Sequence, residues 1–187
     1  MRLAARPRSQ ARLSAVFIAF ALTLPVAIWL YATQTFSGHM LAHLLLTLGA
    51  APLLLAALPR WHPRVPFWLA FVTLNLVAYG QHLPGVSMAL MGSIPGVALE
   101  ALLFLGTGLL FWAAVRRGGA GALILLLLQM LACALLGAAI TFARPGTYMH
   151  PASDVSTGGV LMWVLGGAVY MSSALVLTDR LLYREAP

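Results

Sequence analysis

The sequence predicts an all-α fold, a polytopic membrane bundle of six transmembrane helices forming a single domain over residues 1–187. Of its residues, 61% are hydrophobic and 8% are charged, and the mean hydropathy is +0.93. A soluble domain of this length cannot bury so much apolar surface. The apolar residues also gather in runs, most of them long enough to cross a hydrocarbon core of about 30 Å. All 11 basic residues are arginines, and they lie between these runs.

The first three helices are expected over about residues 13–33, 37–58 and 67–81. The first follows an arginine-rich segment and contains Pro25, which membrane helices tolerate. The second ends at a proline-rich loop over residues 59–66. The third is the shortest, and His82-Leu83-Pro84-Gly85 ends it.

The last three helices are expected over about residues 97–115, 120–142 and 158–178. Two arginines and two glycines at 116–119 separate the fourth from the fifth. On the sixth, Gly159, Gly166 and Ser173 recur at seven-residue spacing, and such a stripe of small residues lets membrane helices approach closely. Asn75 and Gln129 lie within apolar runs, so we expect them to form hydrogen bonds between helices.

The arginine distribution predicts the orientation. With both termini in the cytoplasm, every outer segment lacks arginine except the one that holds Arg144. This matches the excess of basic residues in cytoplasmic loops of membrane proteins. The net charge of +7 therefore reflects topology, and aromatic residues interleaved with basic ones, as a nucleic-acid partner needs, are absent. We expect a multi-pass membrane protein with both termini in the cytoplasm.

This topology brings histidine, methionine and acidic residues to the outer face. His39 and His43 are four residues apart at the outer end of the second helix and share one side of it. His82 ends the third helix, and Glu100 lies near the start of the fourth. Five further residues are predicted to lie at the same face. They belong to the second helix, to the connection between the fifth and sixth helices or to the start of the sixth: Met40, Met149, His150, Asp154 and Met162.

These residue types point to copper. Imidazole and thioether ligands suit copper, and methionine favours Cu(I). An oxidising exterior disfavours free thiolates, and Cys133 is the single cysteine. We expect carboxylates to orient a ligating imidazole or to take part in proton transfer. The predicted ligands are His39, His43 and His82, then Met40 and His150; the predicted carboxylates are Asp154 and Glu100; Met162 and Met149 are further candidates.

Other interpretations stay open. A histidine at a helix end can satisfy backbone groups, a methionine can simply pack, and Glu100 can stabilise the positive end of its helix. A haem-binding redox protein is the main alternative, because bundle histidines can ligate haem. A copper transporter is a third, although Asn75, Gln129 and Cys133 offer few polar groups at the midplane. In each case we expect a protein that is not an enzyme.

Four motifs resemble those of the polytopic CtaG-type cytochrome c oxidase assembly factors. They are FSGHMLAH at 36–43 with Pro52 following, QHLPG at 81–85, LEA at 99–101 through GLLFW at 108–112, and Asp154 followed by GGVLMW at 158–163. Together they span residues 36–163 in the expected order.

The resemblance implies a multi-pass protein of the bacterial inner (plasma) membrane that helps to assemble a haem–copper oxidase by binding or delivering copper at its outer, periplasmic face. The implied partners are an oxidase subunit, periplasmic copper chaperones and the lipid bilayer. Relatives often carry histidines around the glutamate of the fourth helix, where this chain has Pro95, Gly96 and Ala101, and glutamine where Val155 stands. These departures predict a site with fewer ligands, or a copy that serves another oxidase.

Overall fold

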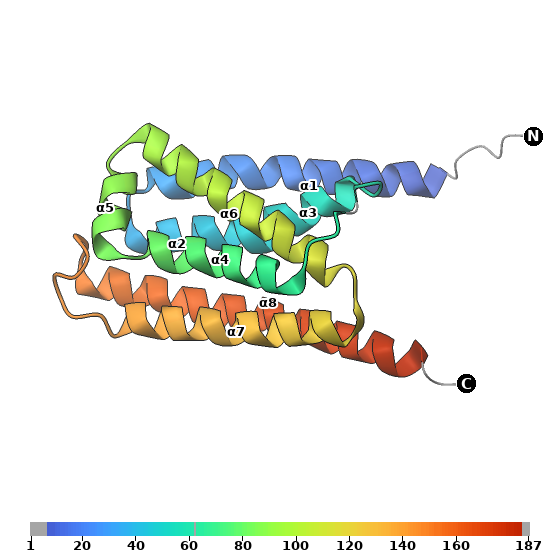
Figure 1. The fold of residues 1–187 in the computed structure, drawn as a ribbon. Helices are drawn as coiled ribbons and strands as arrows, with labels where there is room; N and C mark the ends of the chain where they lie inside the picture. Colours follow the sequence, from blue (N-terminus) through green and yellow to red (C-terminus); the bar gives the residue numbers. More distant parts are fainter. Residues whose placement is uncertain (1–6, 62, 185–187) are drawn as a thin grey trace, which may run out of the picture.

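The computed structural model describes residues 7–61 and 63–184, and over these residues it is entirely helical outside its turns (Figure 1). The prediction of an all-α fold is therefore confirmed. The segments α2, η1 and α3 follow one another without a break and form one continuous helix. The elements are α1 (Pro7–Ala32), α2 (Phe36–Leu44), the π-helical η1 (Leu45–Ala50), α3 (Ala51–Ala57), α4 (Phe67–Gln81), α5 (Pro84–Met91), α6 (Ile94–Val115), α7 (Gly119–Thr141) and α8 (Ala152–Arg184).

Prolines mark helix starts where the sequence analysis expected loops. Residues 84–91 were predicted as a connection but form α5, with Pro84 in its first turn. Helix α6 begins at Ile94 rather than near 97, because Pro95 also lies in a first turn, where its missing N–H costs nothing. Helix α8 begins at Ala152, directly after Pro151 and six residues before the predicted 158. These differences lengthen the helical part of the outer end.

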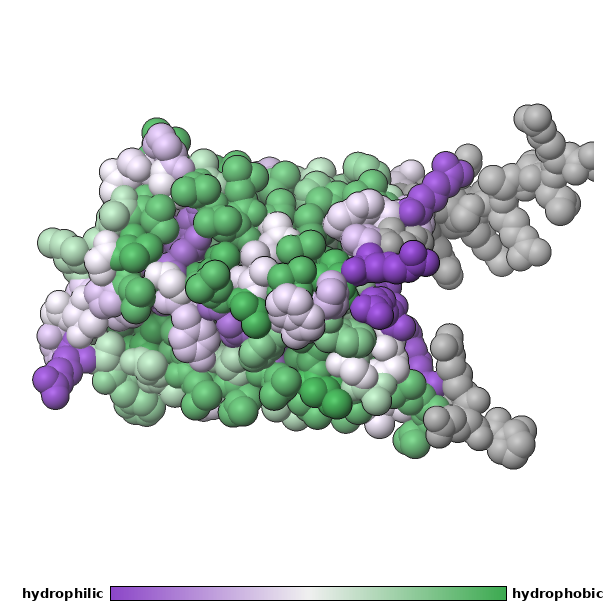
Figure 2. Space-filling model, in the orientation of Figure 1, coloured by the Kyte–Doolittle hydropathy of each residue, from purple (hydrophilic) through white to green (hydrophobic). Residues whose placement is uncertain are grey.

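The helices run side by side along the bundle, and the arginines separate between its two ends. The start of α1, the end of α8 and the connections 58–66 and 116–118 share one end, whereas α5 and the connection 142–151 lie at the other (Figure 1). Hydrophilic side chains gather at the first end, while apolar side chains cover the visible flank (Figure 2). The connections that carry Arg60, Arg64, Arg116 and Arg117 thus lie at the end opposite to the connection 142–151, which carries Arg144. The cytoplasmic placement of the first end stays a prediction.

Length and hydropathy mark an all-helical membrane protein. Four helical stretches are long and apolar enough to cross a membrane: Phe36–Ala57, Ile94–Val115, Gly119–Thr141 and Ala152–Tyr183. Val16–Ala32 and Phe67–Gln81 are apolar but shorter. Large apolar side chains such as Leu76, Ile28 and Leu102 are exposed, as expected of a surface that faces lipid. The number of six transmembrane helices stays a prediction.

Glycines bring α7 and α8 into close contact. A Cβ atom added at Gly159 would lie 2.7 Å from the carbonyl oxygen of Gly137, and one added at Gly166 would lie 2.6 Å from Cys133 Sγ. Both distances are shorter than real Cβ contacts. The predicted role of Gly159 and Gly166 in close helix approach is confirmed.

Polar side chains join α4 to α7 inside the bundle. Asn75 Nδ2 donates a hydrogen bond to Gln129 Oε1 at 2.8 Å, as the sequence predicted. Tyr79 OH donates to the carbonyl oxygen of Ala132 at 2.8 Å. At the arginine-rich end, Arg116 and Arg117 donate to the carbonyl oxygens of Leu55 and Val65, each at 2.9 Å. These hydrogen bonds hold the helices in the arrangement from which the polar side chains of α2 and α6 project.

Candidate metal centre

The start of α2 is held in place at every free backbone N–H of its first turn. The side chain of Thr35 accepts from Gly38 N at 3.1 Å, and its carbonyl oxygen accepts from His39 N at 3.0 Å. The carboxylate of Asp154, in the first turn of α8, accepts from Phe36 N at 2.7 Å and from Ser37 N at 3.1 Å. The N–H groups of Phe36, Ser37 and Gly38, which have no partner inside the helix, are thus all satisfied. This capping fixes the position from which His39 and His43 project.

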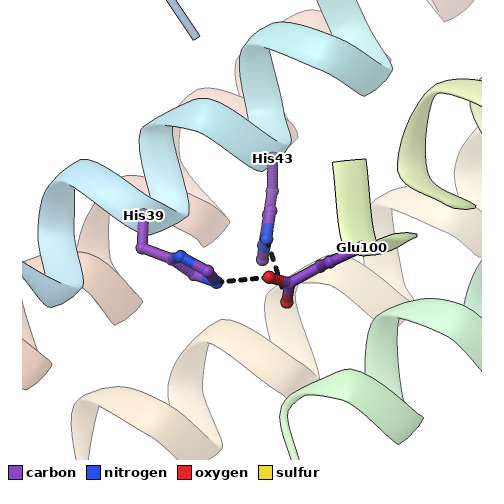
Figure 3. A group of neighbouring side chains, drawn as sticks. All are labelled: His39, His43 and Glu100. Carbon is purple, nitrogen blue, oxygen red and sulfur yellow. Dashed lines mark ion pairs between the residues drawn. The ribbon is translucent and has the colours of Figure 1, made fainter. Parts of the chain in front are cut away.

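His39 and His43 converge on Glu100 of α6 (Figure 3). His39 Nε2 lies 3.1 Å from Glu100 Oε2, and His43 Nε2 lies 3.2 Å from Glu100 Oε1. One ligand atom from each of the three residues lies within 4.8 Å of the other two. We call these three residues the outer centre. Two imidazoles and one carboxylate at this spacing can bind a single metal ion.

The outer centre is deeply buried and poor in hydrogen bonds. His39 and His43 are each 3% exposed, and Glu100 is 1% exposed. Among the residues that the structure describes, five of their polar atoms have no hydrogen-bond partner: His39 Nε2, both ring nitrogens of His43 and both carboxylate oxygens of Glu100. The contacts to Glu100 have ion-pair distances but lack the alignment of hydrogen bonds. Buried polar atoms are rarely left without a partner, and one bound cation would satisfy His39 Nε2, His43 Nε2 and the Glu100 carboxylate.

Aromatic rings hold the imidazoles in position. Phe104, one turn after Glu100, stacks on the ring of His43 with centroids 4.0 Å apart. Tyr31 of α1 packs edge-on against His39 and His43 at 5.0 and 5.9 Å. The sequence analysis missed both residues, because an aromatic side chain in an apolar run gives no signal that separates ring packing from lipid contact.

A π-helical segment, η1, begins two residues after His43. In η1, the N–H of Ala51 bonds to Leu46 O, five residues back, so it leaves the carbonyl of Thr47 free. Pro52 has no N–H to offer that carbonyl. Instead, the indole Nε1 of Trp112 on α6 donates to Thr47 O at 2.8 Å. The π-segment therefore ties the histidine-bearing helix to the helix that carries Glu100.

His82 does not join the outer centre. Its ring lies 5.4 Å from that of His43, but its Nε2 contacts Met40 Sδ at 3.1 Å and its Nδ1 contacts the carbonyl oxygen of Ala78. The group whose ligand atoms lie close together is His39, His43 and Glu100, and Glu100 was expected only to orient a ligand or to move protons. The sequence could not foresee this, because which side of α6 carries Glu100 inward depends on packing. The predicted site of three histidines stays a prediction.

The other predicted residues lie apart from the outer centre. Asp154 caps α2 and does not orient an imidazole. The ring of His150 packs edge-on against Phe36 at 5.7 Å. Tyr148, whose pKa burial raises, donates from its hydroxyl to the carbonyl oxygen of His82 at 2.8 Å. Met149 is exposed, whereas Met162 of α8 is buried and lines a cavity together with Met40.

A groove of about 800 Å³ leads from the outer end of the bundle to His39. Its walls come from α1, α2, α5, α6 and the connection 142–151. The groove carries three thioethers and a second imidazole, from Met88, Met91, Met149 and His150. It therefore gives the outer centre a route to the surface lined by soft ligands.

One comparison with known proteins identifies the family. The family model described as the cytochrome c oxidase caa3 assembly factor matches residues 11–184, which include the outer centre, the groove and all of the motifs at 36–163. No curated protein and no solved structure matches the chain. The chain belongs to the cytochrome c oxidase caa3 assembly factor family.

Proposed function

We propose that this membrane protein binds copper at the outer centre and hands it to a subunit of a haem–copper oxidase during assembly. The observation that carries the proposal is the convergence of His39, His43 and Glu100, whose polar atoms are buried without hydrogen-bond partners. Membership of an oxidase assembly family supplies the context. The action is binding and release, with no catalytic step, so we propose that the protein is not an enzyme.

Burial supports a functional reason for these three residues. A carboxylate inside a membrane protein is costly unless a charge or a hydrogen bond compensates it. Neither the imidazoles nor any other described group gives Glu100 an aligned donor. A Cu(I) ion bound to both imidazoles and to the carboxylate would leave no net charge at the site, because it balances the single negative charge. Bound copper would thus offset the free energy that the copper-free protein spends on burying the Glu100 carboxylate.

The groove supports copper as transient cargo. A structural metal site is closed, whereas a carrier must let its metal enter and leave. His39 lines the groove, so one edge of the outer centre reaches the periplasmic side in the predicted orientation. Thioethers along the groove favour Cu(I) over harder ions. A periplasmic chaperone or the oxidase subunit would then exchange copper at the mouth of the groove.

The geometry disfavours a haem at this centre. The rings of His39 and His43 lie 4.3 Å apart on one helix, with Glu100 between their Nε2 atoms and Phe104 stacked on His43. Axial ligands must approach a haem from its two faces, with the porphyrin between them. Glu100 and Phe104 occupy the space that a porphyrin would need. An absorption spectrum without a Soret band from the purified protein is therefore expected.

Complementation tests the proposed function. In a strain that lacks this protein, we expect low copper content and low activity of the oxidase, which the wild-type gene restores. A His39→Ala gene should fail to restore either, while a Met171→Leu gene, altered at an exposed position of α8, should restore both. Normal oxidase activity in the deletion strain, or full rescue by His39→Ala at equal protein level, would overturn the proposal.

A further inference from the structure

The contact between His82 and Met40 identifies a second group of ligands beside the outer centre. His82 Nδ1 lies against the carbonyl oxygen of Ala78, one turn back on α4. A carbonyl oxygen only accepts hydrogen bonds, so Nδ1 carries the proton. In a neutral imidazole the other nitrogen, Nε2, then has a lone pair and no proton. The tautomer of His82 is therefore set by the backbone of its own helix.

That lone pair points at another acceptor. His82 Nε2 lies 3.1 Å from Met40 Sδ, and a thioether sulfur has no proton to donate. Both side chains are buried, Met40 at 1% exposed and His82 at 5%. Two lone pairs therefore face each other out of water with no hydrogen between them. A cation bound to both would turn this unfavourable contact into a favourable one.

The surroundings of Met40 favour a soft cation. A cavity of about 30 Å³ adjoins Met40, His43 and Ala78, and Met162 and Cys133 also line it. This exceeds the roughly 10–15 Å³ that one water molecule needs, so an ion fits. The Cys133 thiol donates its proton to the carbonyl oxygen of Met162 at 3.3 Å, and Met162 supplies the second thioether among the residues that line the cavity. Thioether and imidazole ligands select Cu(I).

We propose that Met40 Sδ and His82 Nε2, with Met162 as a third ligand from the cavity wall, form a separate Cu(I) site next to the outer centre. This proposal rests on the proposed function, and it specifies Cu(I) as the ion and the route that the ion takes inside the protein. Met40 and His43 are three residues apart on α2, and the rings of His43 and His82 lie 5.4 Å apart. Cu(I) that enters through the groove can thus pass from the outer centre to a sulfur-containing site without leaving the protein.

X-ray absorption at the copper edge of Cu(I)-loaded, detergent-purified protein tests the second site. Wild-type protein should bind two equivalents of Cu(I), with sulfur scatterers as well as nitrogen or oxygen. The Met40→Leu/Met162→Leu variant should lose the sulfur scatterers and one equivalent. A His39→Ala/His43→Ala variant should keep the sulfur scatterers. Met171→Leu, exposed on α8, is the matched control and should match the wild type.

The outcomes separate this proposal from the proposed function. Wild-type copper bound by nitrogen and oxygen alone would overturn the second site and leave the outer centre standing. Unchanged sulfur scattering in Met40→Leu/Met162→Leu would also overturn it. Absence of any bound copper would overturn the proposed function itself. The wild-type spectrum decides even if the double variant fails to fold, and Leu for Met is a volume-conserving change that cores tolerate well.

Discussion

Asp154 and Phe36 lie 118 positions apart in the chain, yet the backbone N–H of Phe36 donates to Asp154 Oδ2 at 2.7 Å. The second carboxylate oxygen accepts from Ser37 N at 3.1 Å. One side chain at the start of α8 thus caps the helix that carries both histidines of the outer centre.

Removing that cap should cost stability without removing copper. Asp154→Ala leaves the N–H groups of Phe36 and Ser37 without their charged acceptor, and hydrogen bonds to charged groups are each worth about 1.5–3 kcal/mol. Because the carboxylate is partly exposed, we expect the free energy of unfolding to fall by roughly 2 kcal/mol. This should appear as a lower midpoint of thermal unfolding in detergent. Asp179→Ala, exposed on the same helix, is the control. An unchanged midpoint would contradict the capping role, and a loss of copper from folded Asp154→Ala protein would show that the carboxylate also acts on the outer centre.

Helix approach at Gly159 should not tolerate a side chain. A Cβ there would meet the backbone of α7, 2.5 Å from Thr141 N and 2.7 Å from Gly137 O, and backbone cannot yield cheaply. Gly159→Ala should therefore destabilise the protein by about 1–3 kcal/mol. Gly167→Ala on the same helix meets nothing within 4 Å, so it should not lower the midpoint of unfolding and should raise it slightly, because alanine favours the helix over glycine. Equal midpoints for the two variants would refute the close packing.

The hydrogen bond between Asn75 and Gln129 should appear as a coupling energy. A double-mutant cycle with Asn75→Ala and Gln129→Ala removes the 2.8 Å bond from either side. For polar pairs in membrane proteins we expect a coupling of about 0.6 kcal/mol, up to about 1.7 kcal/mol. Additive effects of the two changes would show that the pair adds nothing to the α4–α7 contact.

The groove should govern how fast copper arrives, not how tightly it is held. Replacing Met88, Met91 and Met149 by leucine removes three thioethers from the walls but leaves the outer centre intact. We expect severalfold slower loading from a Cu(I)–chelator complex in stopped-flow measurements, with unchanged affinity at equilibrium. Met171→Leu controls for a methionine outside the groove. Wild-type loading rates in the triple variant would remove the groove from the route.

Much of the fold followed from the sequence because its signals are local. Runs of apolar residues predicted the main helices, the spacing of Gly159 and Gly166 predicted a close helix contact, and buried amides predicted the bond from Asn75 to Gln129. The helix starts were predicted less accurately. A proline can end one helix or begin the next, and Pro84 and Pro95 both lie in a first turn, where the backbone N–H groups have no partner inside the helix.

The candidate site was predicted only in part, because it depends on rotation between helices. The four-residue spacing of His39 and His43 is a property of one helix. Whether Glu100 or His82 meets them depends on how α6 and α4 pack on α2, and no local pattern encodes this. The caps, the Phe104 stack and the bond from Trp112 to Thr47 are long-range contacts of the same kind.

Equilibrium competition for Cu(I) between a chromophoric chelator and the purified protein tests the central claim most directly. His43→Ala should bind copper at the outer centre more than 100-fold more weakly, since even outer-sphere partners of a metal are worth about 10- to 100-fold. Glu100→Gln, which keeps the shape but removes the charge, should also weaken binding. Met171→Leu, exposed on α8 and outside the groove, is the control and should retain wild-type affinity. Wild-type affinity and stoichiometry in His39→Ala/His43→Ala protein would contradict the account.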